Sequence, residues 1–362
     1  MVKVTILGAG VTGMMAAAKL PRDHDITIVA DLLPGDYDTK EWASPWAGAI
    51  WVGVHQSKPH EQKMQLEGFA GLWKLAETNP ESSVRQIEMT EIMDRGTKSD
   101  VWYAHKVPAF RWMTPDELPK GAIYGMKYKT VVLTPQKFLL WLYERLQARG
   151  VKFLRTKVFA LADLKGLGHD ILINASGFGS ETLKDVQEKN LTSWRLQCVV
   201  AKAPPTYDCL YIRRGPNGYY STAFSRLDGT VYCGGVLTEA SRDVSINDDH
   251  RATVWLLHLN LIVAYANLVF QICRNAHLNQ PDVFPSPNPK DWDILYDHVG
   301  VFPSLDKDIA GVRCEKELLG DQRVIHAYGQ NAGGYVYSFG LARAVVNLVD
   351  EFLLDIPTVA RL

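Results

Sequence analysis

The sequence predicts an α/β fold: a discontinuous domain around a parallel sheet, with an α+β insertion built on an antiparallel sheet. Three observations support this prediction. Short apolar runs that lead into glycine turns occur near the start, the middle and the end of the 362 residues. Residues 195–236 instead alternate in β fashion between turn residues, as an antiparallel sheet does. The length of the chain leaves room for two such parts.

The first apolar run belongs to Val2–Asp31, the most informative stretch of the chain. Strand Val4–Leu7 leads into the glycine turn Gly8–Gly13 (GAGVTG), and a small-residue helix is expected over Met14–Leu20. A second strand, Ile26–Val29, then runs to an acidic residue. This order and spacing are those of a Rossmann-like dinucleotide-binding unit.

Individual residues of this unit have expected roles. Gly8 permits the tight turn, Gly10 lets the backbone approach a pyrophosphate, and Gly13 lets the helix pack closely on the strand. The N–H groups at the helix N-terminus favour the pyrophosphate anion. Asp31 follows the second strand at a spacing that suits hydrogen bonds from ribose hydroxyl groups.

Three later stretches extend the same domain. Trp42–Trp51 is a small, irregular segment that could run along a planar cofactor. Asp170–Gly177 is a buried strand that ends in a small-residue turn. Near the end of the chain, strand Arg323–Gly329 and loop Gln330–Tyr335 precede a long helix over Ser338–Leu354. A second helix N-terminus is therefore expected to point toward the cofactor.

The domain boundaries follow from these stretches. Residues 1–55, 135–190 and 296–362 are expected to form the discontinuous nucleotide-binding domain. Residues 56–134 and 191–295 are expected to form the inserted substrate and interface domain. Because the chain begins directly with a core strand, we expect no cleaved signal peptide.

Composition argues against several classes of function. The formal net charge is −1 and the charged residues are scattered, which disfavours nucleic acid or an anionic membrane as a partner. The five cysteines form no CxxC pair and no Cys/His spacing typical of metal ligands. We therefore expect reduced, intracellular thiols and no metal site.

One apolar stretch, Val254–Cys273, is nearly long enough to span a bilayer. It contains four polar residues, namely His258, Asn260, Asn267 and Gln271. We therefore expect no transmembrane segment, and instead a buried or interface helix that would support an interaction role. A homodimer is a separate expectation.

Five segments together resemble the D-amino acid oxidase / D-aspartate oxidase family of FAD enzymes, and fungal members most closely. They follow the family order over nearly the whole chain: Gly8–Gly13, Ala43–Ala49, Ile173–Gly177, Cys233–Gly235 and His326–Gly329 with Gly333–Tyr335. The resemblance implies FAD as the cofactor and a small-molecule substrate, from which the flavin takes a hydride at a carbon bearing nitrogen. It also implies O₂ as the electron acceptor, H₂O₂ as a product and no obligatory side-chain base.

The resemblance also assigns cofactor contacts by position. The glycine turn and Asp31 would hold the pyrophosphate and ribose, Val158 and Ser176 would lie on the adenine and pyrophosphate side, and the remaining segments would line the flavin. The residues concerned are Gly8, Ala9, Gly10, Val11, Thr12, Gly13, Asp31, Ala43, Ser44, Gly48, Ile50, Val158, Ser176, Gly177, Ala332, Gly333, Gly334, Tyr335 and Val336.

The substrate half departs from the family pattern at Phe302. The family carries an arginine that binds the α-carboxylate in a V/T-G-aliphatic-R-P context, which here reads Val299–Pro303 with Phe302 at the arginine position. A phenyl ring cannot replace a planar, bidentate guanidinium. The residues expected near the substrate are His55, Thr222, Arg226, Leu237, Phe302, Tyr335 and Tyr337.

Three explanations of this departure stay open. In the first, another cation binds the carboxylate, with Arg111, Arg213, Arg214, Arg226, Arg242 and His55 as candidates. In the second, the substrate lacks a free carboxylate, and the protein is a flavin-dependent tailoring enzyme of a non-amino-acid secondary metabolite, as the apolar Phe302 and Leu237 favour. In the third, it is a catalytically silent FAD-binding paralogue.

The last three residues, Ala360–Leu362 (ARL), have the small–basic–leucine form of the peroxisomal address S-K-L. Fungal members of the family also tend to end in such a tripeptide. We therefore expect recognition by the peroxisomal import receptor and a peroxisomal location, with a cytoplasmic location as the alternative.

Overall fold

The structure is a computed structural model of the 362-residue chain. It describes residues 1–39, 41–203, 207–215, 220–245, 272–286, 288, 291–305 and 311–354, with residues 235 and 236 described by their backbone alone. Most of the apolar stretch Val254–Cys273, turn residues 216–218 and the C-terminal Ala360–Leu362 lie outside the described residues. The chain forms two compact units: Met1–Val84, Pro135–Ser193 and Phe302–Leu362 make the first, and Arg85–Thr134 and Trp194–Val301 make the second.

The first unit is built on a six-stranded sheet. In sheet order its strands are β13 (Arg313–Leu319), β14 (Gln322–Tyr328), β7 (Ile171–Asn174), β1 (Lys3–Leu7), β2 (Asp25–Ala30) and β6 (Lys152–Arg155). The five strands from β14 to β6 pair in parallel, and β13 pairs antiparallel with β14. The predicted parallel sheet, assembled from the start, middle and end of the chain, is therefore confirmed.

Apolar residues on both faces explain why the central strands are parallel and buried. One buried cluster joins β1, β2, β7 and β14 to the helical turn Leu161–Leu167. Its members are Leu7, Val29, Leu161, Leu164, Leu172, Leu183 and Val324. Each such side chain contributes roughly 1.5–3 kcal/mol relative to an exposed one.

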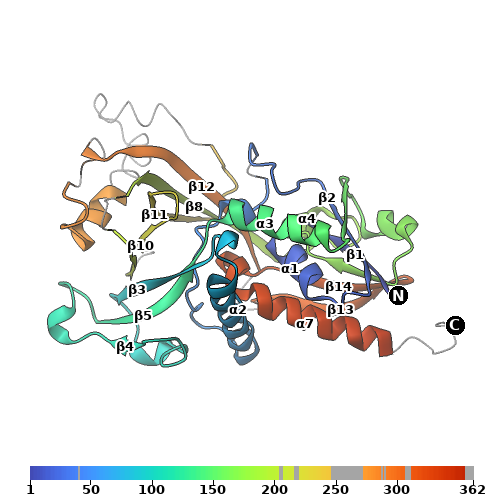
Figure 1. Ribbon diagram of the computed structural model, residues 1–362, viewed down its shortest axis with the longest axis horizontal. Coiled ribbons are helices and arrows are strands. Elements are labelled where there is room, and N and C mark those ends of the chain that lie inside the picture. Colours follow the sequence, from blue (N-terminus) through green and yellow to red (C-terminus); the bar gives the residue numbers. More distant parts are fainter. Residues whose placement is uncertain are drawn as a thin grey trace. The chain divides into compact units, whose positions relative to one another are not determined.

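Five helices accompany this sheet: α1 (Val11–Lys19), α2 (Pro59–Thr78), α3 (Pro135–Ala148), α4 (Gly179–Thr182) and α7 (Gly334–Leu354). Helices α2 and α7 lie side by side in Figure 1. A Cβ at Gly68 of α2 would lie 1.9 Å from the Val336 carbonyl oxygen, and one at Gly340 of α7 would lie 2.1 Å from the Met64 carbonyl oxygen. The two backbones are therefore in direct contact.

This contact changes the division of the chain. The sequence-based boundaries assign residues 56–134 to the insertion, whereas α2 belongs to the first unit. The amphipathic pattern of α2 showed that it buries one face, but not that the buried face meets α7.

The second unit is built on an eight-stranded sheet. In sheet order its strands are β12 (Ile294–Leu305), β8 (Leu191–Lys202), β11 (Thr230–Glu239), β10 (Tyr220–Ser225), β9 (Leu210–Arg214), β3 (Arg85–Met93), β5 (Tyr124–Val132) and β4 (Arg111–Trp112). From β8 to β4 the neighbours pair antiparallel, except that β9 and β3 are parallel. The antiparallel sheet predicted over residues 195–236 is confirmed.

The described chain also contains an α-helical stretch over residues 272–279 and short 3₁₀ turns. The 3₁₀ turns are η1 (Ser44–Trp46), η2 (Pro80–Ser82), η3 (Lys98–Asp100), η4 (Pro115–Glu117), η5 (Leu161–Leu167) and η8 (Asn331–Gly333). No helix among the described residues is both long and apolar enough to cross a bilayer.

Candidate active site

The glycine turn between β1 and α1 is sterically closed to larger residues. Gly8 has φ of +112°, and a Cβ there would lie 2.4 Å from the Ala175 carbonyl oxygen. A Cβ at Gly13 would lie 2.0 Å from the Gly8 carbonyl oxygen. The tight turn at Gly8 and the close helix–strand packing at Gly13 are thus both present, as the spacing predicts.

Helix α1 begins at Val11, three residues before the predicted start at Met14. The reason is that Gly10 is extended (φ −70°, ψ 175°) and acts as the N-cap, so Val11–Gly13 are already helical. The first-turn N–H groups therefore belong to the glycine turn itself, at the C-terminal end of β1. This is the arrangement that binds a pyrophosphate.

The segment that contains Ser44 lies against this helix terminus. The Val11 N–H donates to Ser44 Oγ at 3.0 Å, and the Tyr335 hydroxyl donates to the Ser44 carbonyl oxygen at 2.9 Å. Gln330 Nε2 donates to Thr12 Oγ1 at 3.0 Å. Three of the segments expected to hold the cofactor, from separate parts of the chain, therefore meet at the N-terminus of α1.

The last glycine-rich loop is shorter than predicted. Residues Asn331–Gly333 form the 3₁₀ turn η8, and α7 starts at Gly334, four residues before the expected start at Ser338. A Cβ at Gly334 would lie 3.4 Å from Val11 Cγ1. The second helix therefore begins beside the first, as the sequence predicts.

Two tyrosines that were expected near the substrate are buried and hydrogen-bonded within the first unit. Tyr335 gives its hydroxyl to the Ser44 backbone, and the Tyr337 hydroxyl accepts a hydrogen bond from Gln65 Nε2 at 2.9 Å. A Cβ at Gly333 would lie 2.7 Å from the Tyr337 ring. These contacts hold the cofactor-side loop in place, and Gln65 was not singled out from the sequence.

On the ribose side, Asp31 follows β2 directly and is exposed. Lys157 Nζ lies 3.7 Å from Asp31 Oδ2, and the Arg155 guanidinium binds Asp36 at 2.6 and 3.2 Å. The bond from Arg155 lowers the pKa of Asp36, with help from the Leu33 N–H. The sequence predicted Asp31 but not these two cations, each of which is paired with a carboxylate at this edge.

The last predicted cofactor positions lie close to the same strands. Val158 is half-buried against the cluster that contains Leu7 and Val29. Ser176 follows β7, where its N–H and hydroxyl both donate to Asn174 Oδ1, at 3.2 and 2.7 Å. Ile50 and Gly48 lie in the loop after η1.

Residues 3–348 match the model of the DAO family, described as FAD dependent oxidoreductase. The chain belongs to this family. Its cofactor is accordingly FAD, and the segments that the sequence assigned to FAD all lie in the first unit. The tight packing at Gly8 and Gly13 and the position of the α1 N-terminus directly after β1 fit a dinucleotide of this kind.

Individual family relatives extend over almost the whole chain. A D-aspartate oxidase of Talaromyces thermophilus is 26% identical over 96% of this chain and 95% of that protein. A D-amino-acid oxidase of Fusarium vanettenii is 28% identical over 96% of each. The solved structure of glycine oxidase from Geobacillus kaustophilus matches with a TM-score of 0.71 at 16% identity, over 97% of this chain and 95% of that one, and shows that the fold is shared.

In this family member, three expected substrate residues share one face of the sheet in the second unit. Thr222 pairs with Gly234, and Leu237 follows on the same side after a bulge. The Arg226 guanidinium lies 4.9 Å from the ring centre of Tyr232, which also points to that side. The opposite face carries the apolar cluster of Val199, Ala201, Tyr207, Ala223, Val231, Cys233, Ile272, Ala276 and Phe284.

The polar face contains a buried ion pair that the sequence did not reveal. Glu91, which is fully buried, accepts hydrogen bonds from the Tyr103 hydroxyl at 2.7 Å and the Tyr128 hydroxyl at 2.9 Å. Its other oxygen lies 3.6 Å from Arg214 NH2. Burial is the largest single influence on the pKa of Arg214 and would lower it, but Glu91 together with Tyr103, Tyr220 and Tyr128 raises the pKa.

The arginines considered as partners of a substrate carboxylate differ in their contacts. Arg111 binds Glu117 in a bidentate pair at the surface, Arg213 binds Asp94, and Arg242 is exposed. Arg214 differs, because among the described residues it makes no hydrogen bond and has only the long contact to Glu91. Its Nε is inaccessible to solvent, whereas 19% of its side chain is exposed.

For two residues expected near the substrate, Phe302 and His55, the structure gives only their burial and position in the chain. Phe302 is half-buried in β12 and is the first residue of the last segment of the first unit. His55 is half-buried in the loop before α2.

Proposed function

We propose that this family member is an oxidase of the D-amino acid oxidase type whose substrate carries a carboxylate bound by Arg214. The observation that carries the proposal is the guanidinium of Arg214, whose side chain is only 19% exposed and whose N–H groups donate no hydrogen bond within the described chain. Buried polar groups are nearly always hydrogen-bonded, so such a donor set indicates a ligand. A carboxylate matches the planar fork of a guanidinium.

The proposed reaction is the oxidation of a carbon that bears nitrogen. Bound FAD would supply the hydride acceptor, and the nitrogen of the substrate would lose a proton to give the imine, which water hydrolyses. O₂ would take up the two electrons together with two protons and give H₂O₂. The protein orients the substrate and fixes its charge. Tyr220, the register partner of Arg214, has its pKa raised to about 12, mainly by burial, so its hydroxyl stays protonated and can donate.

Glu91 limits how strongly Arg214 can bind the substrate carboxylate. Because it already neutralises Arg214, the substrate carboxylate adds hydrogen bonds to a guanidinium that is partly compensated. We therefore expect a contribution of roughly 1.5–3 kcal/mol, typical of a hydrogen bond to a charged group. This is also why the substrate range should differ from that of enzymes with an arginine at the position of Phe302.

The test is a substrate panel read by peroxide release for the wild type, Arg214→Met and Arg242→Met. The panel contains neutral and acidic D-amino acids and amines without a carboxylate. We expect Arg214→Met to raise KM for carboxylate substrates about 10- to 100-fold, as the loss of one such contact requires, with FAD content unchanged. Arg242 is exposed, so Arg242→Met should behave as the wild type.

The other outcomes separate the alternatives. Oxidation of amines that Arg214→Met leaves unchanged would identify a substrate without a carboxylate and favour the tailoring-enzyme reading, which the apolar Phe302 and the 37% exposed Leu237 support. A yellow protein whose flavin is reduced by no member of the panel would favour the silent paralogue.

Substitution of Phe302 by arginine restores the family residue at this position. If the rest of the substrate site is preserved, Phe302→Arg should gain activity on neutral D-amino acids, because a bidentate carboxylate partner is added. The measurement is anaerobic flavin reduction by D-alanine. Phe302→Lys is the control, since it adds the charge without the fork. No gain with either variant would mean that the pocket has been rebuilt around another substrate.

Production of H₂O₂ would suit a peroxisomal enzyme, and the fungal relatives are compatible with this location. Import through Ala360–Leu362, an interface role of Val254–Cys273 and a homodimeric state stay predictions. Ala360–Leu362 and most of Val254–Cys273 lie outside the described part of the chain.

A further inference from the structure

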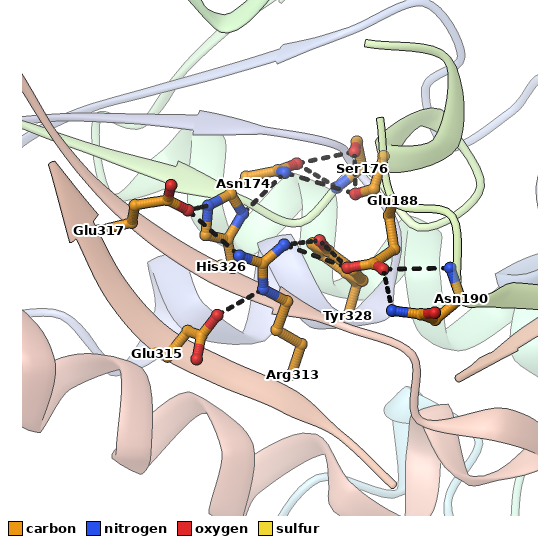
Figure 2. A network of polar contacts seen from close by, with 10 residues as sticks. Asn174, Ser176, Glu188, Asn190, Arg313, Glu315, Glu317, His326 and Tyr328 are labelled. Atoms are coloured by element: carbon orange, nitrogen blue, oxygen red, sulfur yellow. Dashed lines mark hydrogen bonds and ion pairs between the residues drawn. The ribbon is translucent and has the colours of Figure 1, made fainter. Parts of the chain in front are cut away.

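A polar network connects the three neighbouring strands β7, β14 and β13 beside the turn that follows β7 (Figure 2). In the parallel register, Leu7 of β1 lies beside Asn174 of β7, which lies beside His326 of β14. Asn174 and His326 are both fully buried. The sequence alone assigned no role to either side chain. Asn174 is the last residue of β7, and His326 is its neighbour in β14.

The hydrogen bonds of Asn174 fix the orientation of its amide. Its Oδ1 accepts from both the hydroxyl and the N–H of Ser176, so the carbonyl end points to the turn after β7. Its Nδ2 therefore faces His326 Nδ1 at 3.1 Å and Ser180 Oγ at 3.3 Å. Asn174 is the bridge between the turn and the histidine.

This orientation determines the tautomer of His326. Because Nδ1 accepts the Asn174 N–H, the proton lies on Nε2 and is donated to Glu317 Oε2 at 3.0 Å. Burial is the main cause that lowers the pKa of His326, and the positive charge of Arg313 acts in the same direction. Glu317 and Glu315 oppose them, and the Tyr328 ring lies 5.8 Å away.

The turn held by Asn174 packs directly on the glycine turn. A Cβ at Gly8 would meet the Ala175 carbonyl oxygen at 2.4 Å and the Ser176 Cα at 3.4 Å. A shift of the turn at Ala175 and Ser176 would therefore displace the glycine turn that leads into α1. The chain Glu317–His326–Asn174–Ser176 runs from the β13 edge of the sheet to this contact.

We propose that His326 and Asn174 are positioning residues for FAD, which keep the Ser176 turn in the conformation that receives the cofactor. The proposal rests on the assignment of Ser176 to the FAD site. Neither side chain needs to touch FAD. Neutral His326 orients the Asn174 amide, and the amide holds both polar groups of Ser176.

The test compares FAD dissociation constants of apo-protein titrated with FAD, by flavin fluorescence, for four variants. His326→Leu removes the acceptor for Asn174, and Asn174→Leu removes the bridge. We expect each to raise the dissociation constant about tenfold, as the loss of one hydrogen bond in a positioning network requires. His326→Gln, whose side-chain carbonyl can accept the same N–H, should restore most of the affinity.

Tyr328→Phe is the matched control. Tyr328 is two residues from His326 on the same strand, is equally buried, and bonds Arg313 and Glu188 but not Asn174. It should lower the melting temperature of the apo-protein as His326→Leu does, yet leave the FAD dissociation constant unchanged. If Tyr328→Phe weakens FAD as much as His326→Leu, or if neither does, the positioning role is wrong.

A pH profile provides a second readout. Protonation turns His326 Nδ1 from an acceptor into a donor that faces the Asn174 N–H, so FAD affinity should fall on the acidic side of the usual histidine pKa of about 6.5. His326→Gln should lack this part of the pH dependence, and a profile identical to the wild type would overturn the proposal. A wild type that binds no FAD at any pH would instead refute the cofactor assignment itself.

Discussion

Replacement of Gly13 by alanine is expected to give a protein that folds but does not retain FAD. The new Cβ would lie 2.0 Å from the Gly8 carbonyl oxygen, and because this is a backbone atom, no side-chain rotation can relieve the contact. Helix α1 must then shift away from β1, which displaces the N–H groups that receive the pyrophosphate. We expect FAD affinity to fall at least about 1000-fold, roughly 4 kcal/mol.

The measurement is the flavin absorbance of the purified variant together with an FAD titration of the apo-protein. Gly166→Ala is the matched control, because a Cβ at Gly166 has no neighbour within 4 Å. That variant should bind FAD as the wild type does. A Gly13→Ala protein with normal flavin content would mean that the cofactor does not depend on the α1 terminus.

Replacement of Glu91 by leucine is expected to cause the largest loss of stability on the polar face of the second sheet. The change leaves the Arg214 charge unpaired and removes the acceptor shared by Tyr103 and Tyr128. Removal of one partner of a buried ion pair typically costs about 3–5 kcal/mol. Urea unfolding of the second unit within the full-length protein, followed by tryptophan fluorescence, measures the loss.

The double variant Glu91→Leu with Arg214→Met distinguishes the two causes of this loss of stability. If the unpaired guanidinium is responsible, removal of its charge should recover part of the lost free energy of unfolding, because the two effects are coupled. An additive double variant would show that the tyrosine hydroxyl groups, and not the charge, account for the cost.

The sequence predicted the first unit better than the second, and the reason is physical. The cofactor segments are local patterns in which strand, glycine turn and helix follow one another, so Gly8 and Gly13 could be given roles without knowledge of distant contacts. The start of α1 was placed three residues late because Gly10, with its extended backbone, is the N-cap and Val11–Gly13 already continue as helix. The first residue of a helix is determined by such backbone conformations and not by amino-acid composition.

The polar face of the second sheet could not be predicted from local patterns. Glu91 and Tyr128 are 37 residues apart, and Arg214 joins them only through the parallel pairing of β3 with β9. A charged residue inside a strand usually indicates a solvated face, which is how Glu91 would be interpreted alone. The hydrogen bonds from Tyr103 and Tyr128 offset the cost of burying the Glu91 carboxylate. Both tyrosines are distant from Glu91 in the sequence and reach it only in the folded chain.

The order of strands in both sheets also determines when each unit can fold. In the first unit, β1 pairs with β7, and β7 in turn needs β14, which ends at Tyr328. In the second, β3 lies between β5 and β9, and β9 comes more than 110 residues after β3 has ended. Neither sheet can form all its strand pairs until late in synthesis, because β12 ends at Leu305 and β14 ends at Tyr328. Long-range pairing of this kind folds slowly and leaves strand edges unpaired in the meantime, and such edges favour aggregation.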